Sequence, residues 1–277
     1  MTNHIAGKTI IVTGAGSGFG RLVASKAASA GAKVVCGDVN AGSLDETVAG
    51  VRAANGSVAG LAGDVSDLTY MKALAAKAVE EFGSIDVLIN NAGVMPLAFF
   101  RDHAKAADAW NRCIDVNIRG VMNGIIAVHD QMIAQGRGHV VNISSIYGNF
   151  PVAGAAVYGA SKAAVNFFSD ALRVESQGKI KVMTIKPTGV PATALGKGVI
   201  NPEAIIGILG QNSGYLAAMG AMAQGKAGEG QMDAEDIRYL ALDPVYIAEA
   251  VLHAIDQPWG VSIGEVTVRA SGDGYIL

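Results

Sequence analysis

The chain has 277 residues, of which 51% are hydrophobic and 16% charged, and it contains 36 glycines, a composition that indicates a core-rich globular protein and excludes a disordered one. The formal net charge of −3 and the lack of basic runs exclude the electrostatic signature of a nucleic-acid-binding protein. The cysteines and histidines lack metal-ligand spacing, residues 1–10 lack a secretory signal pattern, and no apolar stretch approaches the ~20 residues of a membrane-spanning helix, so we expect a cytoplasmic protein with no metal, nucleic-acid or membrane partner.

Short strand-like runs alternate with helical patterns along the whole chain. Strands are predicted at Lys8–Val12, Lys33–Gly37, Ser57–Ala62, Asp86–Asn90, His139–Ile143, Lys179–Lys186 and Glu265–Arg269. Helices are predicted at Gly18–Ala30, Ser43–Ala54, Leu68–Phe82, Ala106–Gln135, Ala156–Ser176 and, after the N-cap pattern Asp243-Pro244, at Val245–Asp256. Because the strands are apolar almost throughout, we expect a doubly wound α/β fold, with one seven-stranded and mainly parallel sheet covered on both faces, in a single domain over residues 1–277.

Residues 190–242 interrupt this alternation. The segment is rich in Gly, Ala, Met and Gln, and it shows helical pieces near Pro202–Leu209 and Tyr215–Ala223 but no clear strand. An apolar insertion of this size in a compact domain is typical of a functional lid. We therefore predict that residues 190–242 form a substrate-binding lid, with a dispensable loop as the alternative.

The first predicted strand runs into the glycine-rich turn Thr13–Gly20 and then into a helix. Glycines let the backbone approach a diphosphate closely, and the helix N-terminus supplies free N–H groups and a positive dipole end. The sequence therefore predicts a dinucleotide site formed by Gly14, Ser17, Gly18, Phe19 and Gly20. Asp38 ends the second strand, where a carboxylate accepts hydrogen bonds from an adenosine ribose and repels a 2′-phosphate, so NAD is favoured over NADP.

Tyr158 and Lys162 are spaced to lie on one face of a predicted helix. An ammonium group beside a phenol favours the phenolate and is expected to lower the tyrosine pKa from about 10. Such a phenol gives or takes a proton near neutral pH. The pair alone is weak evidence for a catalytic site, because Tyr and Lys four residues apart occur on many solvated helices.

The order of the motifs resembles that of the short-chain dehydrogenase/reductase family, in its compact one-domain type, over essentially the whole chain. Besides the glycine turn, the resemblance rests on Asp64-Val65 after the third strand, Asn90-Asn91-Ala92-Gly93 after the fourth, Asn117, and Ser145 thirteen residues before Tyr158. It implies a Rossmann fold and an NAD-dependent oxidoreductase. The implied cofactor contacts include Asp64, Val65, Asn91, Ala92, Gly93, Tyr158 and Lys162.

The resemblance also implies a catalytic centre of Asn117, Ser145, Tyr158 and Lys162. Tyr158 would be the general acid/base on the substrate oxygen, Lys162 would lower its pKa and bind the nicotinamide ribose, and Ser145 would position the same oxygen. Asn117 would bend its helix and help hold a water that links Lys162 to solvent. Ser144 should point the other way from Ser145 at the strand end, so we expect a structural role for it.

After the sixth strand the sequence departs from the family pattern. The family commonly has Pro-Gly and then Val and Thr at fixed steps, whereas this chain has Pro187-Thr188-Gly189-Val190-Pro191-Ala192-Thr193. Thr188 replaces the glycine, and Thr193 comes one residue later than usual. We expect Pro187, Thr188, Val190 and Thr193 at the cofactor, with Val190 offering its backbone to the carboxamide; which threonine contacts the cofactor is left open.

The side chains expected to face the substrate are mostly apolar, namely Met95, Ile146, Tyr147, Phe150, Leu195, Ile205, Leu209, Met219 and Met222. This lining favours an uncharged, fairly bulky secondary alcohol or the matching ketone. One alternative is a 3-oxoacyl carrier or CoA reductase, which would normally use NADP and a basic docking patch. A non-catalytic nucleotide-binding regulator and a dehalogenase are further alternatives, and the intact Asn117, Ser145, Tyr158 and Lys162 set and the glycine turn disfavour them.

The expected oligomeric state rests on the same resemblance. Members of the family are commonly tetramers that pair through the long helices corresponding to Ala106–Gln135 and Ala156–Ser176. We therefore expect a homotetramer or a dimer, with the uncharged tail Gly274–Leu277 buried against a neighbouring subunit.

Overall fold

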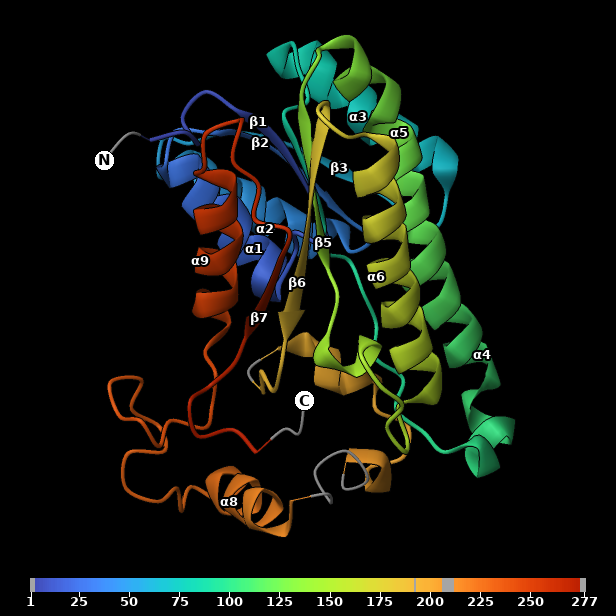
Figure 1. The fold of residues 1–277 in the computed structure, drawn as a ribbon, viewed down its shortest axis with the longest axis vertical. Helices are drawn as coiled ribbons and strands as arrows, with labels where there is room; N and C mark the ends of the chain where they lie inside the picture. The colour runs from blue at the N-terminus through green and yellow to red at the C-terminus, as the bar shows by residue number, and fades with distance from the viewer. Residues whose placement is uncertain (1–2, 192, 206–211, 275–277) are drawn as a thin grey trace.

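Seven parallel strands form one continuous sheet in the computed structural model, which describes residues 3–191, 193–205 and 212–274 (Figure 1). The strand order is β3-β2-β1-β4-β5-β6-β7, and every pairing in it is parallel. The strands are β1 (Thr9–Thr13), β2 (Lys33–Asp38), β3 (Ser57–Ala62), β4 (Val87–Asn90), β5 (Gly138–Ile143), β6 (Ile180–Pro187) and β7 (Glu265–Val268). The predicted doubly wound α/β architecture is confirmed, with each strand within two residues of its expected bounds.

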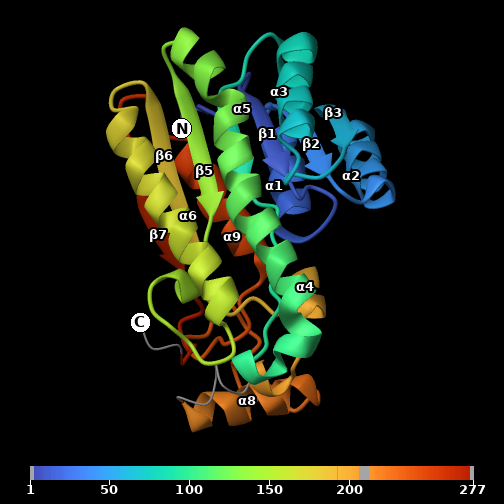
Figure 2. The ribbon, with the colours of Figure 1, turned by 90° about the vertical axis from the view of Figure 1, so that its right-hand side faces the viewer.

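Helices cover both faces of this sheet, as Figures 1 and 2 show. One face packs against α1 (Gly18–Ser29), α2 (Ala41–Ala53) and α9 (Pro244–Ile255). The other face packs against α3 (Leu68–Phe82), α5 (Gly120–Ala134) and α6 (Ala156–Glu175). The apolar strands are therefore buried from both sides, which is why they lack an alternating polar pattern.

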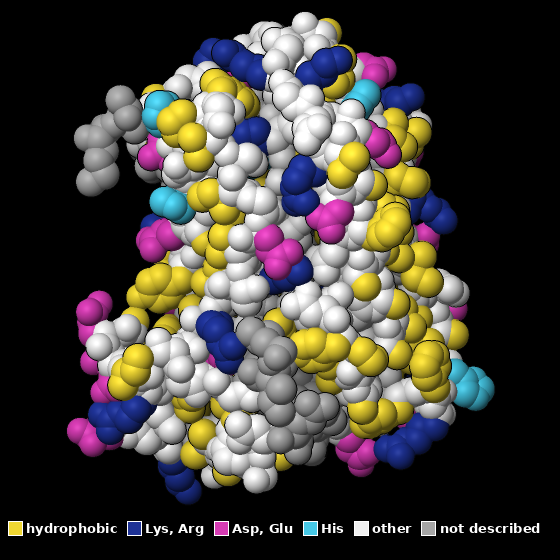
Figure 3. All heavy atoms as spheres, in the orientation of Figure 1, with side chains coloured by type: hydrophobic (Ala, Val, Ile, Leu, Met, Phe, Trp, Pro, Cys, Tyr) yellow, Lys and Arg dark blue, Asp and Glu magenta, His cyan; other side chains and the backbone are white. Residues whose placement is uncertain are grey.

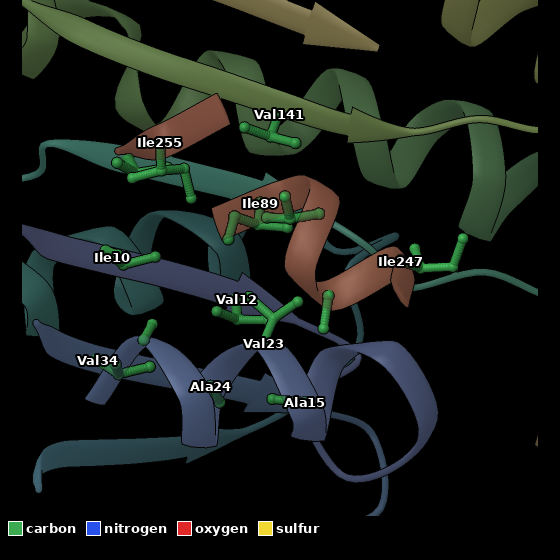
Figure 4. Packing of buried hydrophobic residues seen from close by; sticks show 14 of the residues in the cluster. Ile10, Val12, Ala15, Val23, Ala24, Val34, Ile89, Val141, Ile247 and Ile255 are labelled. Carbon is green, nitrogen blue, oxygen red and sulfur yellow. The ribbon is translucent and has the colours of Figure 1, made fainter. Parts of the chain in front are cut away.

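Successive strand residues feed two separate cores. Ile10 and Val12 of β1 lie in the core beneath α1 and α9, whereas Ile11, between them, lies in the core beneath α3 and α5. Figure 4 shows the first of these cores, where Val23 and Ile247 meet the sheet from α1 and α9. Burying a side chain of this size stabilises the fold by roughly 1.5–3 kcal/mol, so the sheet is a rigid platform for whatever lies at its edge.

The predicted start of the last helix is confirmed at Asp243. Its side chain accepts a hydrogen bond from the backbone N–H of Val245, and Pro244 occupies the first turn of α9. This arrangement satisfies a backbone donor that would otherwise lack a partner at the helix N-terminus.

The long helical stretch predicted at Ala106–Gln135 is not one regular helix. It consists of α4 (His103–Ile114), the π-helical turn η2 (Asp115–Arg119) and α5. Asn117 lies within η2, and its side chain bonds the backbone of Val94 through both its Nδ2 and its Oδ1. A π-helical turn widens the helix by one residue and is frequently found at functional sites. The expected distortion at Asn117 is thus present as this turn.

In the segment 190–242, the described residues 193–205 and 212–223 lie beyond the carboxyl ends of the strands. They contain the 3-10 turn η4 (Ala194–Gly198) and α8 (Ser213–Ala223), which Figures 1 and 2 place apart from the sheet, beyond the end to which the strands point. The helix predicted at Pro202–Leu209 begins at residue 203, but its part from residue 206 onward lies outside the described residues. Among the residues that the structure describes, no helix is both long and apolar enough to cross a membrane.

Candidate functional site

A cavity of about 740 Å³ lies at the carboxyl edge of the sheet. In a parallel α/β sheet this edge, where the strand order changes direction, is the usual place for a ligand. Most of the predicted cofactor and catalytic residues line this one cavity: Gly14, Ser17, Gly18, Phe19, Asp38, Asp64, Val65, Asn91, Ala92, Gly93, Ser145, Tyr158, Lys162, Pro187, Thr188, Val190 and Thr193. Gly20 and Asn117 lie behind its wall.

Three glycines of the turn differ in what a side chain at their position would meet. Gly14 has a φ of +66°, and a Cβ there would lie 2.9 Å from the Cα of Ala92. A Cβ on Gly20 would lie 2.2 Å from the carbonyl oxygen of Gly14, so only glycine allows the helix to begin this close to the strand. Gly18 has a φ of +50°, and a Cβ there would meet nothing within 4 Å. The space in front of Gly18 therefore belongs to the cavity.

The N-terminus of α1 faces this space with its backbone donors. The N-cap residue Ser17 makes no side-chain capping bond, and the first turn of α1 contains no acidic residue. Free N–H groups and a positive dipole end at such a turn suit a diphosphate group. The cradle formed by Gly14, Ser17 and Gly18 thus fits the phosphates of a dinucleotide.

Asp38 is fixed in place at the end of β2. Its Oδ2 accepts a hydrogen bond from the backbone N–H of Gly16 at 2.8 Å, and its Oδ1 accepts one from the N–H of Asn40 at 2.8 Å. Arg21, which sequence reasoning did not select, holds the same turn from outside, since its Nε donates to the Gly16 carbonyl at 3.0 Å. The Arg21 guanidinium also pairs with Glu46 at 2.9 Å. The carboxylate of Asp38 is therefore oriented before any ligand arrives.

The segment after β3 carries a second fixed carboxylate. Asp64 pairs with Arg112 of α4 at 2.7 Å, and its Oδ1 accepts hydrogen bonds from the backbone and the hydroxyl of Ser66. Burial raises the pKa of Asp64, but the hydrogen bonds from Arg112 and Ser66 outweigh burial, and the net shift is downward. Arg112 also lines the cavity and was not predicted, because no local motif marks a residue brought there by tertiary packing.

Tyr158 and Lys162 lie one turn apart on α6, and both are buried at the cavity wall. The Nζ of Lys162 lies 5.8 Å from the centroid of the Tyr158 ring and donates to the carbonyl of Ile143 at 2.8 Å. Burial lowers the pKa of Lys162 from its usual 10.5 to about 8. The Tyr147 ring meets the Tyr158 ring edge-on, with centroids 6.1 Å apart. These contacts fix the phenol against the cavity.

The two neighbouring serines have different partners. Ser145 Oγ lines the cavity and accepts a long hydrogen bond from the N–H of Tyr147 at 3.3 Å. Ser144 Oγ donates to the carbonyl of Lys162 at 3.1 Å and contacts Asn166 Oδ1 at 2.6 Å. Ser144 therefore attaches α6 to the segment that follows β5, which also contains Ser145.

Asn117 supports the site from behind the wall. Its side chain is fully buried and donates to Ser161 Oγ at 3.0 Å, and Ser161 Oγ in turn donates to the carbonyl of Tyr158 at 2.6 Å. Together with its two bonds to Val94, this network joins the segment after β4, η2 and α6. The expected water link from Asn117 to Lys162 stays a prediction.

Both threonines of the segment after β6 line the cavity. Thr188 Oγ1 donates to Asp273 Oδ2 at 2.7 Å, whereas Thr193 Oγ1 makes a weaker bond to the carbonyl of Val190 at 3.4 Å. The contact of Thr188 was not foreseen, since Asp273 lies 85 residues away in sequence.

The predicted substrate-facing residues separate into three groups. Met95, Tyr147, Leu195, Ile205 and Met219 line the cavity. Ile146, Phe150 and Met222 are not part of its lining, and for Ile146 the reason is that its side chain is turned into the interior and only 1% exposed. Leu209 lies outside the described residues, as do Tyr275, Ile276 and Leu277 of the predicted tail. Leu97 and Val199 complete the apolar wall and were not anticipated.

Comparison with known proteins agrees with this geometry. The family model for short chain dehydrogenases matches residues 8–203. The 2,5-dichloro-2,5-cyclohexadiene-1,4-diol dehydrogenase LinX of Sphingobium indicum is 34% identical over 266 residues, covering 95% of this chain and 100% of that protein. An uncharacterized oxidoreductase of Listeria monocytogenes, Lmo0432, is 34% identical over 267 residues, with 95% and 96% coverage.

Two solved structures share the fold. A short chain dehydrogenase/reductase from Burkholderia phymatum in complex with NAD superposes with a TM-score of 0.75 at 29% identity, covering 96% of this chain and 90% of that one. An alcohol dehydrogenase from the archaeon Thermococcus sibiricus superposes with a TM-score of 0.76 at 20% identity, covering 98% and 99%.

Proposed function

Since the chain belongs to the short-chain dehydrogenase family and is therefore an oxidoreductase, we propose that it transfers a hydride between NAD(H) and a secondary alcohol or ketone. The observation that carries this proposal is the meeting of two halves in one cavity. The glycine turn and Asp38 line one part, while Ser145, Tyr158 and Lys162 line another. A bound nicotinamide cofactor supplies the hydride chemistry, and the chain supplies position and proton transfer.

The choice of NAD rests on Asp38. Its carboxylate lines the cavity and is locked by the N–H groups of Gly16 and Asn40, so it cannot swing away from a 2′-phosphate. Arg21, a nearby cation, is occupied by the Gly16 carbonyl and by Glu46. The relative from Burkholderia phymatum, solved with NAD, supports the same choice.

In the proposed reaction, Tyr158 takes the proton from the alcohol oxygen during oxidation and returns one during ketone reduction. The buried Lys162 ammonium stabilises the phenolate electrostatically, and Ser145 donates a hydrogen bond that holds the substrate oxygen in line. Asn117 acts through the Ser161 hydroxyl and the segment at Val94, which keep α6 in register with the cavity. No metal is needed for this proton transfer.

We infer an uncharged and fairly bulky substrate from the apolar wall of the cavity. Met95, Leu97, Leu195, Val199 and Met219 make this wall apolar. An apolar surface binds a cyclic or branched carbon skeleton better than a charged acid, because a charge against it would lose its hydration. Lys197 also lines the cavity, but it is exposed to solvent. The related dehydrogenase LinX is named for a cyclic diol, which supports a cyclic secondary alcohol.

A spectrophotometric screen tests the proposal. NAD reduction is measured over aromatic, cyclic, aliphatic and steroid alcohols, with NADP and with carboxylic hydroxy acids in parallel. Turnover of uncharged secondary alcohols with NAD is expected. Preference for NADP would contradict the role of Asp38, and activity confined to charged acids or acyl thioesters would contradict the apolar pocket.

We also infer self-association through α5 and α6. Phe167 and Val174 of α6 are each 74% exposed, and Met122 and Ile126 of α5 are also exposed. Figure 3 shows hydrophobic side chains along the edge of the molecule that carries α4, α5 and α6 in Figure 1. Exposed apolar groups gathered in this way are typical of a subunit interface. Size-exclusion chromatography with light scattering is expected to give a dimer or tetramer, and a monomer would contradict the inference.

A further inference from the structure

Thr188, which stands where the family commonly has glycine, directs its hydroxyl at the C-terminal segment. Its Oγ1 donates to Asp273 Oδ2 at 2.7 Å, and its backbone N–H donates to the carbonyl of Val268 in β7 at 3.1 Å. Only 1% of the Asp273 side chain is exposed, and its carboxylate also pairs with Arg269. A carboxylate this buried is stable only while donors surround it. The position of the turn over residues 270–274 therefore depends on Thr188.

That turn touches residues 212–242 at two places. Gly272 donates its N–H to the carbonyl of Tyr239 at 2.9 Å, and a Cβ on Gly272 would lie 2.7 Å from the carbonyl oxygen of Arg238. A Cβ on Gly274 would lie 2.7 Å from the Cβ of Tyr215 in α8. Contacts this close need glycine, so the backbone of the turn itself supports α8. Figures 1 and 2 show the chain after β7 reaching the space between the strand ends and α8.

α8 in turn forms part of the substrate side of the cavity. Its Met219 lines the cavity, and its Tyr215 is 5% exposed within an apolar cluster that also contains Leu97 and Tyr158. A shift of α8 would therefore move the apolar wall relative to the reactive phenol.

We propose that Thr188 is a positioning residue for the substrate: through Asp273 it fixes the C-terminal turn, and the turn holds α8 over the bound alcohol. The inference rests on the proposed function of the same cavity. It assigns the Thr188 hydroxyl to the C-terminal turn rather than to the cofactor. Glycine at this position would offer no hydroxyl and would leave the turn without this attachment.

The first test compares Thr188→Val, which keeps the shape and removes the donor, with Thr188→Ser, which keeps the donor. The valine variant is expected to raise the KM for the alcohol about tenfold, because it loses one hydrogen bond worth about 1.4 kcal/mol. The KM for the alcohol should rise by a larger factor than the Kd of NADH. The serine variant should restore a near-normal KM. Thr267→Val, on β7 and away from the cavity, is the matched control. A larger effect on NADH binding than on the alcohol would show that Thr188 is a cofactor contact and would overturn the proposal.

The second test needs no turnover, so it separates this proposal from the proposed function. Lys226 is exposed just after α8, and trypsin cleavage there reports how firmly α8 is held. Cleavage is expected to be faster in Thr188→Val and in Gly274→Ala, which pushes the turn away from Tyr215, but not in Thr188→Ser or Thr267→Val. Asp273→Ala, which removes the acceptor for the Thr188 hydroxyl, should mask any added effect of Thr188→Val. Equal cleavage in all variants would contradict the link, whereas absence of NAD-dependent activity in the intact protein would contradict only the function.

Discussion

His139 is expected to make the stability of the fold depend on pH. It lies at the start of β5, opposite Lys181 of β6, and is 1% exposed. Neither ring nitrogen has a hydrogen-bond partner in the part of the chain that the structure describes. Burial, and then the positive charges of Lys181 and Lys8, lower the pKa of His139 from 6.5 to about 3. The backbone N–H of His139 donates to the backbone carbonyl of Asp86, an acidic residue beside it.

The direction of the effect follows from proton linkage. Between about pH 6.5 and pH 3 the unfolded chain binds a proton at His139 that the folded chain does not bind, so acid favours unfolding. The unfolding free energy then falls with pH by a slope that approaches about 1.4 kcal/mol per pH unit. Its expected loss between pH 7 and pH 5 is about 2 kcal/mol. This loss begins as the pH falls through the pKa of His139 in the unfolded chain, and it ends at the pKa of His139 in the folded chain.

Urea unfolding of the wild type and of His139→Leu at several pH values measures this loss. Leucine is similar in size and does not titrate, and it leaves no unpaired polar group in the sheet. Subtracting the two pH profiles removes the contribution of every other acid. The difference should reach about 2 kcal/mol between pH 7 and pH 5. Parallel profiles for the two proteins would refute a neutral, desolvated His139.

Two further substitutions have clear expected outcomes. Asp38→Ala removes the acceptor for Gly16 and Asn40 and the charge that opposes a 2′-phosphate. The Kd for NADH should therefore rise about tenfold, and the preference for NADH over NADPH should shrink. An unchanged cofactor preference in fluorescence titrations would contradict the assignment. Asp243→Ala removes the cap of α9 and should lower the unfolding free energy by about 1 kcal/mol without altering KM, whereas Asp243→Asn, which keeps the acceptor, should lower it by less.

The parts of the site that the sequence predicts are those set by local geometry. The glycine turn and the Tyr158–Lys162 pair each lie within a few residues, and their spacing fixes which side chains share a face. The strands were predictable because both faces of the sheet are buried, which leaves continuous apolar runs such as Ile10–Val12 in β1 and Val87–Ile89 in β4.

The residues that sequence reasoning missed are placed by tertiary packing. Arg112 reaches Asp64 from a different helix, and Asp273 reaches Thr188 from the far end of the chain. Neither carries a local pattern, because charged residues on helices and loops are common on any surface. Ile146 is predicted to face the substrate, but the backbone forms a 3-10 turn there and the side chain is only 1% exposed.

The central claim is that Tyr158 carries the proton transfer in an NAD-dependent reaction. The most direct measurement is kcat for NAD reduction by wild type and by Tyr158→Phe with the best alcohol from the screen, alongside the Kd of NADH for both proteins. Loss of the phenolic hydroxyl should lower kcat by at least about a hundredfold while NADH still binds, since general acid/base catalysis contributes at this scale. Turnover of the phenylalanine variant at the wild-type rate would contradict the account.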